Sequence, residues 1–152
     1  RYYYQVVSLK PNYTCAIAKS INLLGDKWSL LILRDAILHK KSRFKEFKSS
    51  KEKIATNILS NRLKSLLEAS LIVKLNPLGT KKSTRYIATD KGISTLPIII
   101  DLYSFSIDSI DESILNESQI KIKQAITSDR NLFEETKKNE YLNFIQELKS
   151  SL

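Results

Sequence analysis

The sequence predicts a mainly α-helical fold with one small antiparallel β-hairpin. Three features of the 152 residues support this prediction. Apolar residues recur at helical spacing through much of the first half, two short β-prone segments lie near the middle, and helical spacing returns after them. Because 42% of the residues are apolar, the chain can bury the core of one domain, alone or with a short helical extension.

The first part of the chain predicts two consecutive helices. Apolar residues repeat at helical spacing over 17–24, and a Gly-Asp pair at 25–26 then breaks the pattern. A second helix begins at Trp28, whose ring we assign to the core, and the polar stretch 39–42 ends it with cations near its C-terminus.

The next segments predict a helix-turn-helix arrangement. A short helix at 43–48 is followed by the polar connection 48–53, and the stretch 54–68 is again helical by pattern. The longer helix has two unlike faces at about 100° per residue. Its apolar face holds Ala55, Leu59, Leu63 and Leu66, and its opposite face holds Asn57, Ser60, Asn61 and Lys64. Such a helix can dock by one side and read a ligand by the other.

A β-hairpin follows this helix directly. The β-prone segments 72–75 and 84–88 are separated by 76–83, where Pro and Gly mark a turn. The hairpin tip carries Lys81 and Lys82. A hairpin in this position is the wing of a winged helix-turn-helix fold, although a β-ribbon without function would show the same pattern.

The remaining segments predict helices again. Thr89 is a suitable N-cap for a helix through 93–107, with a kink expected at Pro97. Beyond residue 111, helical patterning continues with a break at 127–129. We therefore expect a winged helix-turn-helix domain over 1–110 and a helical extension over 111–152.

The late helices carry more apolar surface than a short tail can readily hide, which predicts a homodimer contact there. The apolar residues concerned are Tyr103, Phe105, Ile107, Phe133, Tyr141, Phe144, Ile145 and Leu148.

Charge along the chain predicts a polyanionic partner. The net charge is +9, and residues 1–91 hold 19 Lys and Arg against 6 Asp and Glu, whereas residues 92–152 hold 6 against 10. The first part is therefore suited to phosphates, and double-stranded DNA is the expected partner.

Composition argues against several other classes of protein. One His, one Cys and three Gly provide no nucleophile signature, phosphate-cradling loop or metal-ligand cluster, so we expect no catalysis, no cofactor and no metal. The apolar runs are too short to cross a bilayer, and a single Cys agrees with a reducing compartment, which predicts a cytoplasmic protein.

Several linked blocks give the chain a specific resemblance. They are Cys15 to Ala18, Leu23 to Arg34, Arg43 to Phe47, Leu59 to Leu66, Leu71 to Val73, and Tyr86 with Thr89 to Gly92. In order and spacing they resemble the HxlR branch of the MarR-like regulators, over residues 13–107. The resemblance implies a winged-helix homodimer that binds operator DNA and usually represses nearby genes. Ala55, Ser70 and Arg85 depart from the usual family residues, Ser or Thr, Gly, and an acidic residue.

Residue chemistry assigns roles at the expected DNA surface. Asn57 and Asn61 would read bases in the major groove, because an amide can bond adenine through two atoms. Thr56 and Ser60 lie at the edge of that face, beside Lys64, although a merely solvated helix face remains an alternative. Arg62 falls near the apolar face and would form either an internal salt bridge or a phosphate contact. Phosphate contacts are expected from Lys45, Lys48, Lys51, Lys81, Lys82 and Arg85.

Cys15 has two interpretations. A thiol near a helix N-terminus with Lys19 one turn away would be reactive, whereas a buried Cys would only fill space. The family resemblance implies that the corresponding Cys senses oxidants or electrophiles in some relatives, and a small-molecule effector is the other option.

A winged-helix module that binds RNA or another protein is the alternative function.

Overall fold

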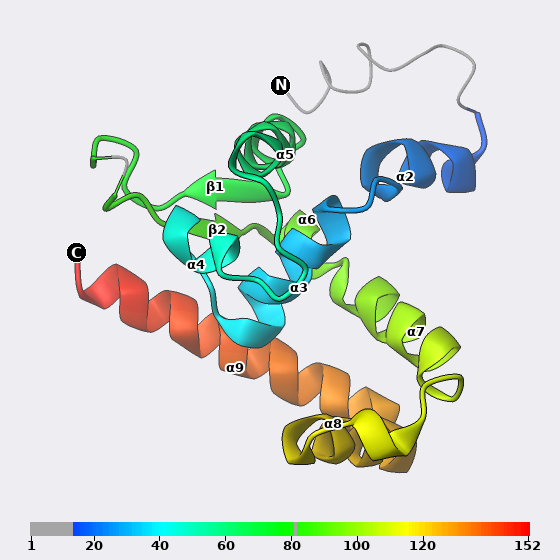
Figure 1. Cartoon of the computed structure of the whole chain (residues 1–152). Coiled ribbons are helices and arrows are strands. Elements are labelled where there is room, and N and C mark those ends of the chain that lie inside the picture. The colour runs from blue at the N-terminus through cyan, green and yellow to red at the C-terminus, as the bar shows by residue number, and fades with distance from the viewer. Residues whose placement is uncertain (1–13, 81) are drawn as a thin grey trace.

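The computed structural model describes residues 14–80 and 82–152 and has the predicted mainly helical architecture with one antiparallel hairpin (Figure 1). Lys81 and the N-terminal residues 1–13 lie outside the described part. In chain order the elements are α2 (Ala16–Leu24), α3 (Ser29–His39), α4 (Phe44–Lys48), α5 (Thr56–Glu68), β1 (Ile72–Lys74), β2 (Tyr86–Ala88), α6 (Asp90–Ile93), α7 (Leu96–Ile107), the 3₁₀ helix η1 (Glu112–Ile114), α8 (Glu117–Ser128) and α9 (Arg130–Ser150).

Helix α3 is central, since it contacts α4, β2, α7 and α9. The predicted break before it is confirmed: Asp26 accepts hydrogen bonds from the backbone N–H groups of Trp28 and Ser29, both 2.9 Å, and so caps the helix. The Trp28 ring packs against the core, with the Lys27 ammonium 4.7 Å from its centre. Leu33 of α3 is fully buried between the surrounding elements.

The predicted helix-turn-helix is formed by α4 and α5. Helix α5 begins at Thr56 rather than at Ile54, because Ile54 is buried in the core before the helix starts. Its N-cap is Ala55, which provides no side-chain hydrogen bond. The helix ends in a Schellman motif, in which the N–H of Ser70 bonds Leu67 O and the N–H of Leu71 bonds Leu66 O. Ser70 has φ of 60°, a left-handed conformation that favours glycine.

The wing, defined as residues 72–88, has shorter strands than the sequence predicts. The register pairs Ile72 with Ala88, Val73 with Ile87 and Lys74 with Tyr86. Beyond this ladder the Leu75 N–H bonds back to Arg85 O, at 2.8 Å, and the chain then opens into a turn. The hairpin and its antiparallel pairing are as predicted.

The expected kink at Pro97 is wrong. The chain forms two helices there, α6 and α7, and Pro97 lies in the first turn of α7, where its missing N–H costs no hydrogen bond. Thr89 caps α6 as predicted by accepting from the Gly92 N–H at 3.1 Å. A side chain at Gly92 would meet Leu71 O at 2.1 Å, so α6 approaches the backbone just before β1 this closely only because the residue is glycine.

Helices α8 and α9 are separated at Asp129, as predicted, and α9 returns along the wing domain on the side away from α5 (Figure 1). Tyr141 of α9 is fully buried, and its hydroxyl oxygen accepts a hydrogen bond from the Ala88 N–H of β2 at 2.8 Å. On the same strand, the Tyr86 N–H donates to Ser42 O at 2.7 Å.

Some of the late apolar residues that were expected to need a partner subunit are already buried within this chain. Phe133, Tyr141, Ile145 and Leu148 are buried against the chain's own β2, α6 and α7. Phe105 in contrast is 88% exposed. In the part of the chain that the structure describes, no helix is long and apolar enough to cross a membrane.

Candidate nucleic-acid interface

Helix α5 presents the predicted polar face to solvent. Its exposed residues are Thr56, Asn57, Ser60, Asn61 and Lys64. Leu59, Leu63 and Leu66 are buried on the other side, where they pack against α3 and α4 residues. The side-chain amides of Asn57 and Asn61 form no hydrogen bond within residues 14–80 and 82–152. This face therefore offers free hydrogen-bond donors and acceptors, and the opposite face of the same helix is packed against the core.

An ion-pair network fixes the turn before α5. Arg34 of α3 donates to Glu52 Oε1 at 2.7 Å and to the buried carboxylate of Asp35 at 2.8 Å. The Arg34 hydrogen bond holds the pKa of Glu52 at about 2, well below its usual value, despite the opposing effect of partial burial. Ser50 donates to the same Glu52 oxygen at 2.6 Å. The start of α5 is thus tied to α3, and the sequence reading missed this role for Arg34 and Glu52.

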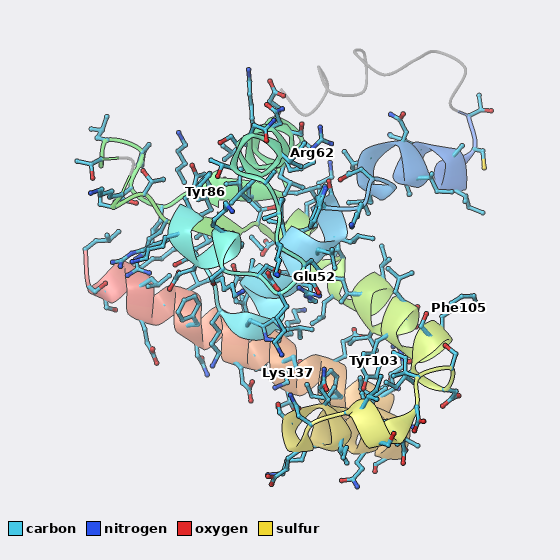
Figure 2. All side chains as sticks on the ribbon, in the orientation of Figure 1. Glu52, Arg62, Tyr86, Tyr103, Phe105 and Lys137 are labelled. Carbon is cyan, nitrogen blue, oxygen red and sulfur yellow. The ribbon has the colours of Figure 1, made fainter. Side chains whose placement is uncertain are left out.

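Arg62 joins α5 to the cap of α3. Figure 2 labels Arg62 on α5. Its guanidinium lies 3.6 Å from Asp26 Oδ1, so the structure has the internal ion pair, one of the two roles predicted for this residue. Partial burial would raise the pKa of Asp26, but hydrogen bonds from Ser29 and Trp28 and the charge of Arg62 together lower it. Asp26 therefore stays ionised and holds both elements.

Four of the predicted phosphate-binding lysines are exposed on the α4 and wing side, namely Lys45, Lys48, Lys51 and Lys82. Lys45 and Lys82 line one groove of about 590 Å³ together with Arg43 and Phe44. Arg43 was not predicted as a site residue. It is exposed at the start of α4 and forms a β-bridge with Arg85, a long-range pairing that no local pattern reveals.

Arg85 does not project freely from the wing as expected of a phosphate ligand. It is half-buried, and its guanidinium donates to the Ser42 hydroxyl at 2.8 Å, which ties the wing to the segment before α4. A phosphate contact by Arg85 would have to share this bond. Lys81, predicted to contact phosphate at the tip, lies outside the described residues.

Asn76 shapes the wing turn. Its amide nitrogen donates to Ser83 O at 2.9 Å, and its carbonyl oxygen accepts from the Arg85 N–H at 3.0 Å. The sequence pattern places Asn76 only within the expected turn 76–83. An Asn just before Pro77 is a signal for such local bonding, because its side chain imitates a backbone turn.

Cys15 is exposed at the N-cap position of α2, so the space-filling interpretation is wrong for this structure. The thiol forms no regular capping bond, yet the N–H groups of Ala18 and Ile17 lower its pKa. Among the described residues, no group of His, Cys, Asp and Glu is placed to hold a metal ion.

Comparisons with known proteins agree with this geometry. The HxlR-like helix-turn-helix family model matches residues 23–114. The helix-turn-helix-type transcriptional regulator YvaP of Bacillus subtilis, itself uncharacterised, is 30% identical over 99 residues, which is 64% of this chain and 90% of YvaP.

Two solved structures have the same fold. PA1607, described as a candidate transcription factor, is 30% identical with a TM-score of 0.60, covering 70% of this chain and 72% of PA1607. A transcriptional regulator of Porphyromonas gingivalis W83 assigned to the MarR family is 26% identical with a TM-score of 0.56, covering 67% of this chain and 99% of that one.

Proposed function

Since this chain belongs to the HxlR-like helix-turn-helix family and is a DNA-binding transcriptional regulator rather than an enzyme, we propose that it represses transcription by binding a pseudo-palindromic operator as a homodimer. The observation that carries the proposal is the exposed polar face of α5, flanked by exposed lysines on α4 and the wing. In this proposal Asn57 and Asn61 read bases, and Lys45, Lys48, Lys51, Lys64 and Lys82 contact phosphates.

A dimer is needed because two recognition helices must lie about 34 Å apart to reach successive major-groove faces. Apolar side chains that the chain leaves exposed support such a contact. Ile98, Leu102 and Phe105 share one face of α7, and Leu132 and Leu142 are exposed on α9. We therefore place the dimer contact on α7 and on the extension over 111–152.

We also propose that Cys15 makes the regulator responsive to oxidants or electrophiles. The thiol is exposed, and its lowered pKa favours the nucleophilic thiolate. A Cys15→Ser variant should retain DNA binding but lose any change in DNA affinity after treatment with diamide. If wild type and variant respond alike, Cys15 is not the sensor.

Selection of bound duplex DNA from a random pool tests the proposed function most directly. We expect a two-fold symmetric motif, and a complex with two chains per duplex. Asn57→Ala and Asn61→Ala should each weaken binding to that motif by about 1 to 3 kcal/mol and leave random duplex nearly unchanged. Lys138→Ala, on exposed α9, is the control and should change neither. Equal losses on both duplexes would mean that the amides do not read bases, and tighter binding to a matched RNA would favour an RNA-binding module instead.

A further inference from the structure

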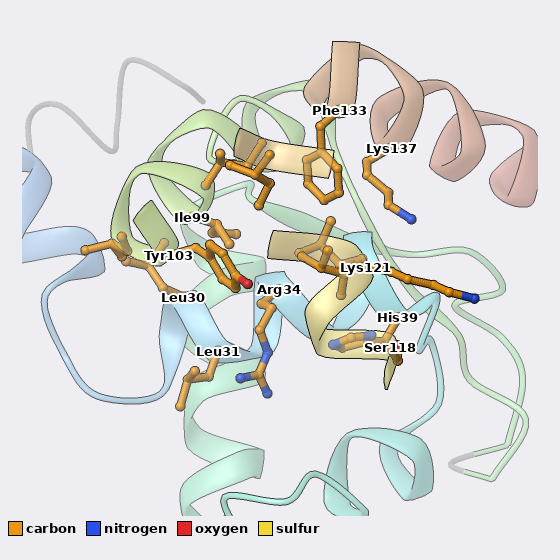
Figure 3. Close-up of a pocket in the computed structure, with 15 residues that line it drawn as sticks. Leu30, Leu31, Arg34, His39, Ile99, Tyr103, Ser118, Lys121, Phe133 and Lys137 are labelled. Atoms are coloured by element: carbon orange, nitrogen blue, oxygen red, sulfur yellow. The ribbon is translucent and has the colours of Figure 1, made fainter. Parts of the chain in front are cut away.

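A cavity of about 600 Å³ lies between α3, α7, α8 and α9 (Figure 3), and α5 lies on the opposite side of α3 from α8 and α9 (Figure 1). This volume is within the range of roughly 300 to 1,000 Å³ that is typical of sites for small molecules. Much of its wall belongs to α8 and α9, beyond residue 114, where the match to the family ends. Helices α8 and α9 of the C-terminal extension therefore complete a cavity whose other wall is formed by α3 and α7.

The cavity wall is mostly apolar. Ile99, Ile122, Ile126 and Phe133 contribute to it together with leucines of α3 and α7. Figure 3 shows Tyr103 and Phe133 both directed into the space. A ligand that fills this cavity must present a largely apolar body, since an apolar surface of this size gains most from contact with apolar atoms.

One polar group inside the cavity has no partner. The Tyr103 hydroxyl is buried and makes no hydrogen bond within the described residues. Leaving a buried hydroxyl unpaired is costly, so the site favours a ligand that accepts a hydrogen bond there. Burial also raises the pKa of Tyr103, against a smaller opposing effect of Lys123, and the hydroxyl therefore keeps the proton that it would donate.

The charged side chains of the described wall are all basic. They are Arg34, Lys121 and Lys137, and the ammonium groups of the two lysines lie on the same side of the cavity in Figure 3. Glu117 and Glu140 pair with these lysines from outside, each at 3.4 Å. Lys121 and Glu117 are 73% and 85% exposed, and Lys137 and Glu140 are partly exposed, so water screens both pairs and a buried anion could compete with them.

Arg34 connects the cavity with the DNA-binding side. It lines the cavity and also holds Glu52 in the turn that precedes α5. An anion in the cavity would attract the same guanidinium. Any displacement of Arg34 toward the ligand would weaken its bond to Glu52 and loosen the start of the proposed recognition helix.

We propose that this cavity binds an apolar small molecule with a single anionic group such as a carboxylate, and that the ligand lowers DNA affinity by competing with Glu52 for Arg34. The effect on DNA rests on the proposed function, whereas ligand binding by itself does not. Tyr103 donates to the anion, Lys121 and Lys137 attract it, and the apolar wall holds its body.

Ligand binding is measured on the full chain without DNA, by displacement of the fluorescent dye anilinonaphthalene sulfonate. Naphthoate should displace the dye at lower concentration than the neutral and nearly isosteric naphthamide, and decanoate in the same titration distinguishes a fatty-acid-like ligand from an aromatic one. Tyr103→Phe should weaken naphthoate binding about fivefold or more. Ser118→Trp, which places a large ring at an exposed position of the wall, should abolish it.

Neighbouring lysines on α9 provide the matched control. Lys137 lines the cavity and Lys138 does not, and the two substitutions change the net charge equally. Lys137→Gln should lower the preference for naphthoate over naphthamide about threefold, and Lys138→Gln should leave it unchanged. Equal binding of naphthoate and naphthamide, or full binding to Ser118→Trp, would overturn the proposed site.

The link to DNA is tested by reciprocity. Naphthoate should lower the affinity for duplex DNA about fivefold or more, and duplex DNA should lower the affinity for naphthoate by the same factor. Glu52→Gln frees Arg34 from a competing carboxylate, so it should raise naphthoate affinity and abolish the coupling. Naphthoate binding that is independent of DNA would overturn the role of Arg34. If the chain binds naphthoate but no DNA, the proposed function is wrong and the ligand site stands. If it binds DNA but no naphthoate, the ligand site is wrong and the proposed function stands.

Discussion

Basic residues on the two sides of this molecule have different partners. On α8 and α9 most of them are paired with acids, as in Lys123 with Glu112 at 2.6 Å and Arg130 with Asp101 at 2.6 Å. On α4, α5, the turn between them and the wing, no ion pair forms within the described residues for Lys45, Lys48, Lys51, Lys64 and Lys82. Both sides carry cations, but most of those on α8 and α9 have an acidic partner within the chain, whereas these five lysines have none among the described residues.

This difference explains why net charge alone is a poor guide to a binding surface. The charge of a paired surface cation is already balanced by an acid of the same chain. An unpaired cation can instead bind a phosphate backbone and release its counterions. We therefore expect the buried contacts of α9 to contribute stability and the unpaired lysines around α4 and α5 to contribute DNA affinity. Substitutions should therefore separate the two properties.

The largest effect should come from α9. Tyr141→Ala removes a fully buried ring and leaves the Ala88 N–H without its partner, so we expect a loss of about 3 to 5 kcal/mol in the free energy of unfolding. Urea denaturation measures this loss. The neighbouring Leu142 is 40% exposed, and Leu142→Ala should cost far less. Similar losses in both variants would mean that α9 does not hold the wing through Tyr141.

The cation side should respond in affinity and not in stability. The triple variant Lys45→Ala, Lys48→Ala and Lys82→Ala should weaken binding to any duplex by about 30-fold or more and reduce the salt slope by about 3. Its unfolding curve should be unchanged. The control triple Lys121→Ala, Lys138→Ala and Lys149→Ala removes equal charge and should keep both slope and affinity. Equal loss in the control would show that only net charge matters.

Glu52 lies in the turn before α5 and is bonded to Arg34 of α3, and its contribution to the free energy of unfolding depends on pH. The pKa of Glu52, about 2 in the folded chain, is below its ordinary value of 4.5, so its stabilising effect is full above pH 4.5 and is lost as pH falls through about 2. Because the carboxylate is 34% exposed, Glu52→Gln should cost only about 1 kcal/mol at pH 7. Unfolding curves of wild type and variant should converge near pH 2. Glu117→Gln, which breaks the exposed pair with Lys121, should leave the free energy of unfolding unchanged. If Glu52→Gln and wild type differ by the same amount of stability at every pH in this range, the Glu52–Arg34 ion pair does not contribute as proposed.

The smallest effect is expected at the end of α5. Ser70 has a positive φ, so Ser70→Gly should relieve strain and raise the free energy of unfolding by up to about 1 kcal/mol, after the greater freedom of Gly in the unfolded chain is subtracted. Ser70→Ala should not stabilise. Thermal unfolding measures the stability of both variants. If Ser70→Ala also stabilises the chain, the gain comes from removing the hydroxyl group and not from relief of backbone strain.

Local features were predictable from sequence because they depend on residues close in the chain. The two faces of α5, the Thr89 cap and the break at Asp129 follow from spacing and capping chemistry alone. The position of Pro97 was misread because a proline is compatible with both a kink and a first turn. No pattern predicts that Tyr141 bonds Ala88, 53 residues away, or that Arg85 bonds Ser42, 43 residues away. Such pairs depend on packing, which also decided that Arg34 would reach Glu52.

The hydroxyl of Tyr141 has a consequence for self-association. A two-stranded sheet exposes unpaired N–H groups along its outer strands, which are templates for pairing with another chain. On β2 two of these donors are covered, Tyr86 N–H by Ser42 O and Ala88 N–H by Tyr141, so a helix and a loop replace the strand that is missing there. Helix α9 and the segment before α4 thus protect the β2 edge of the wing against edge-to-edge pairing with another chain.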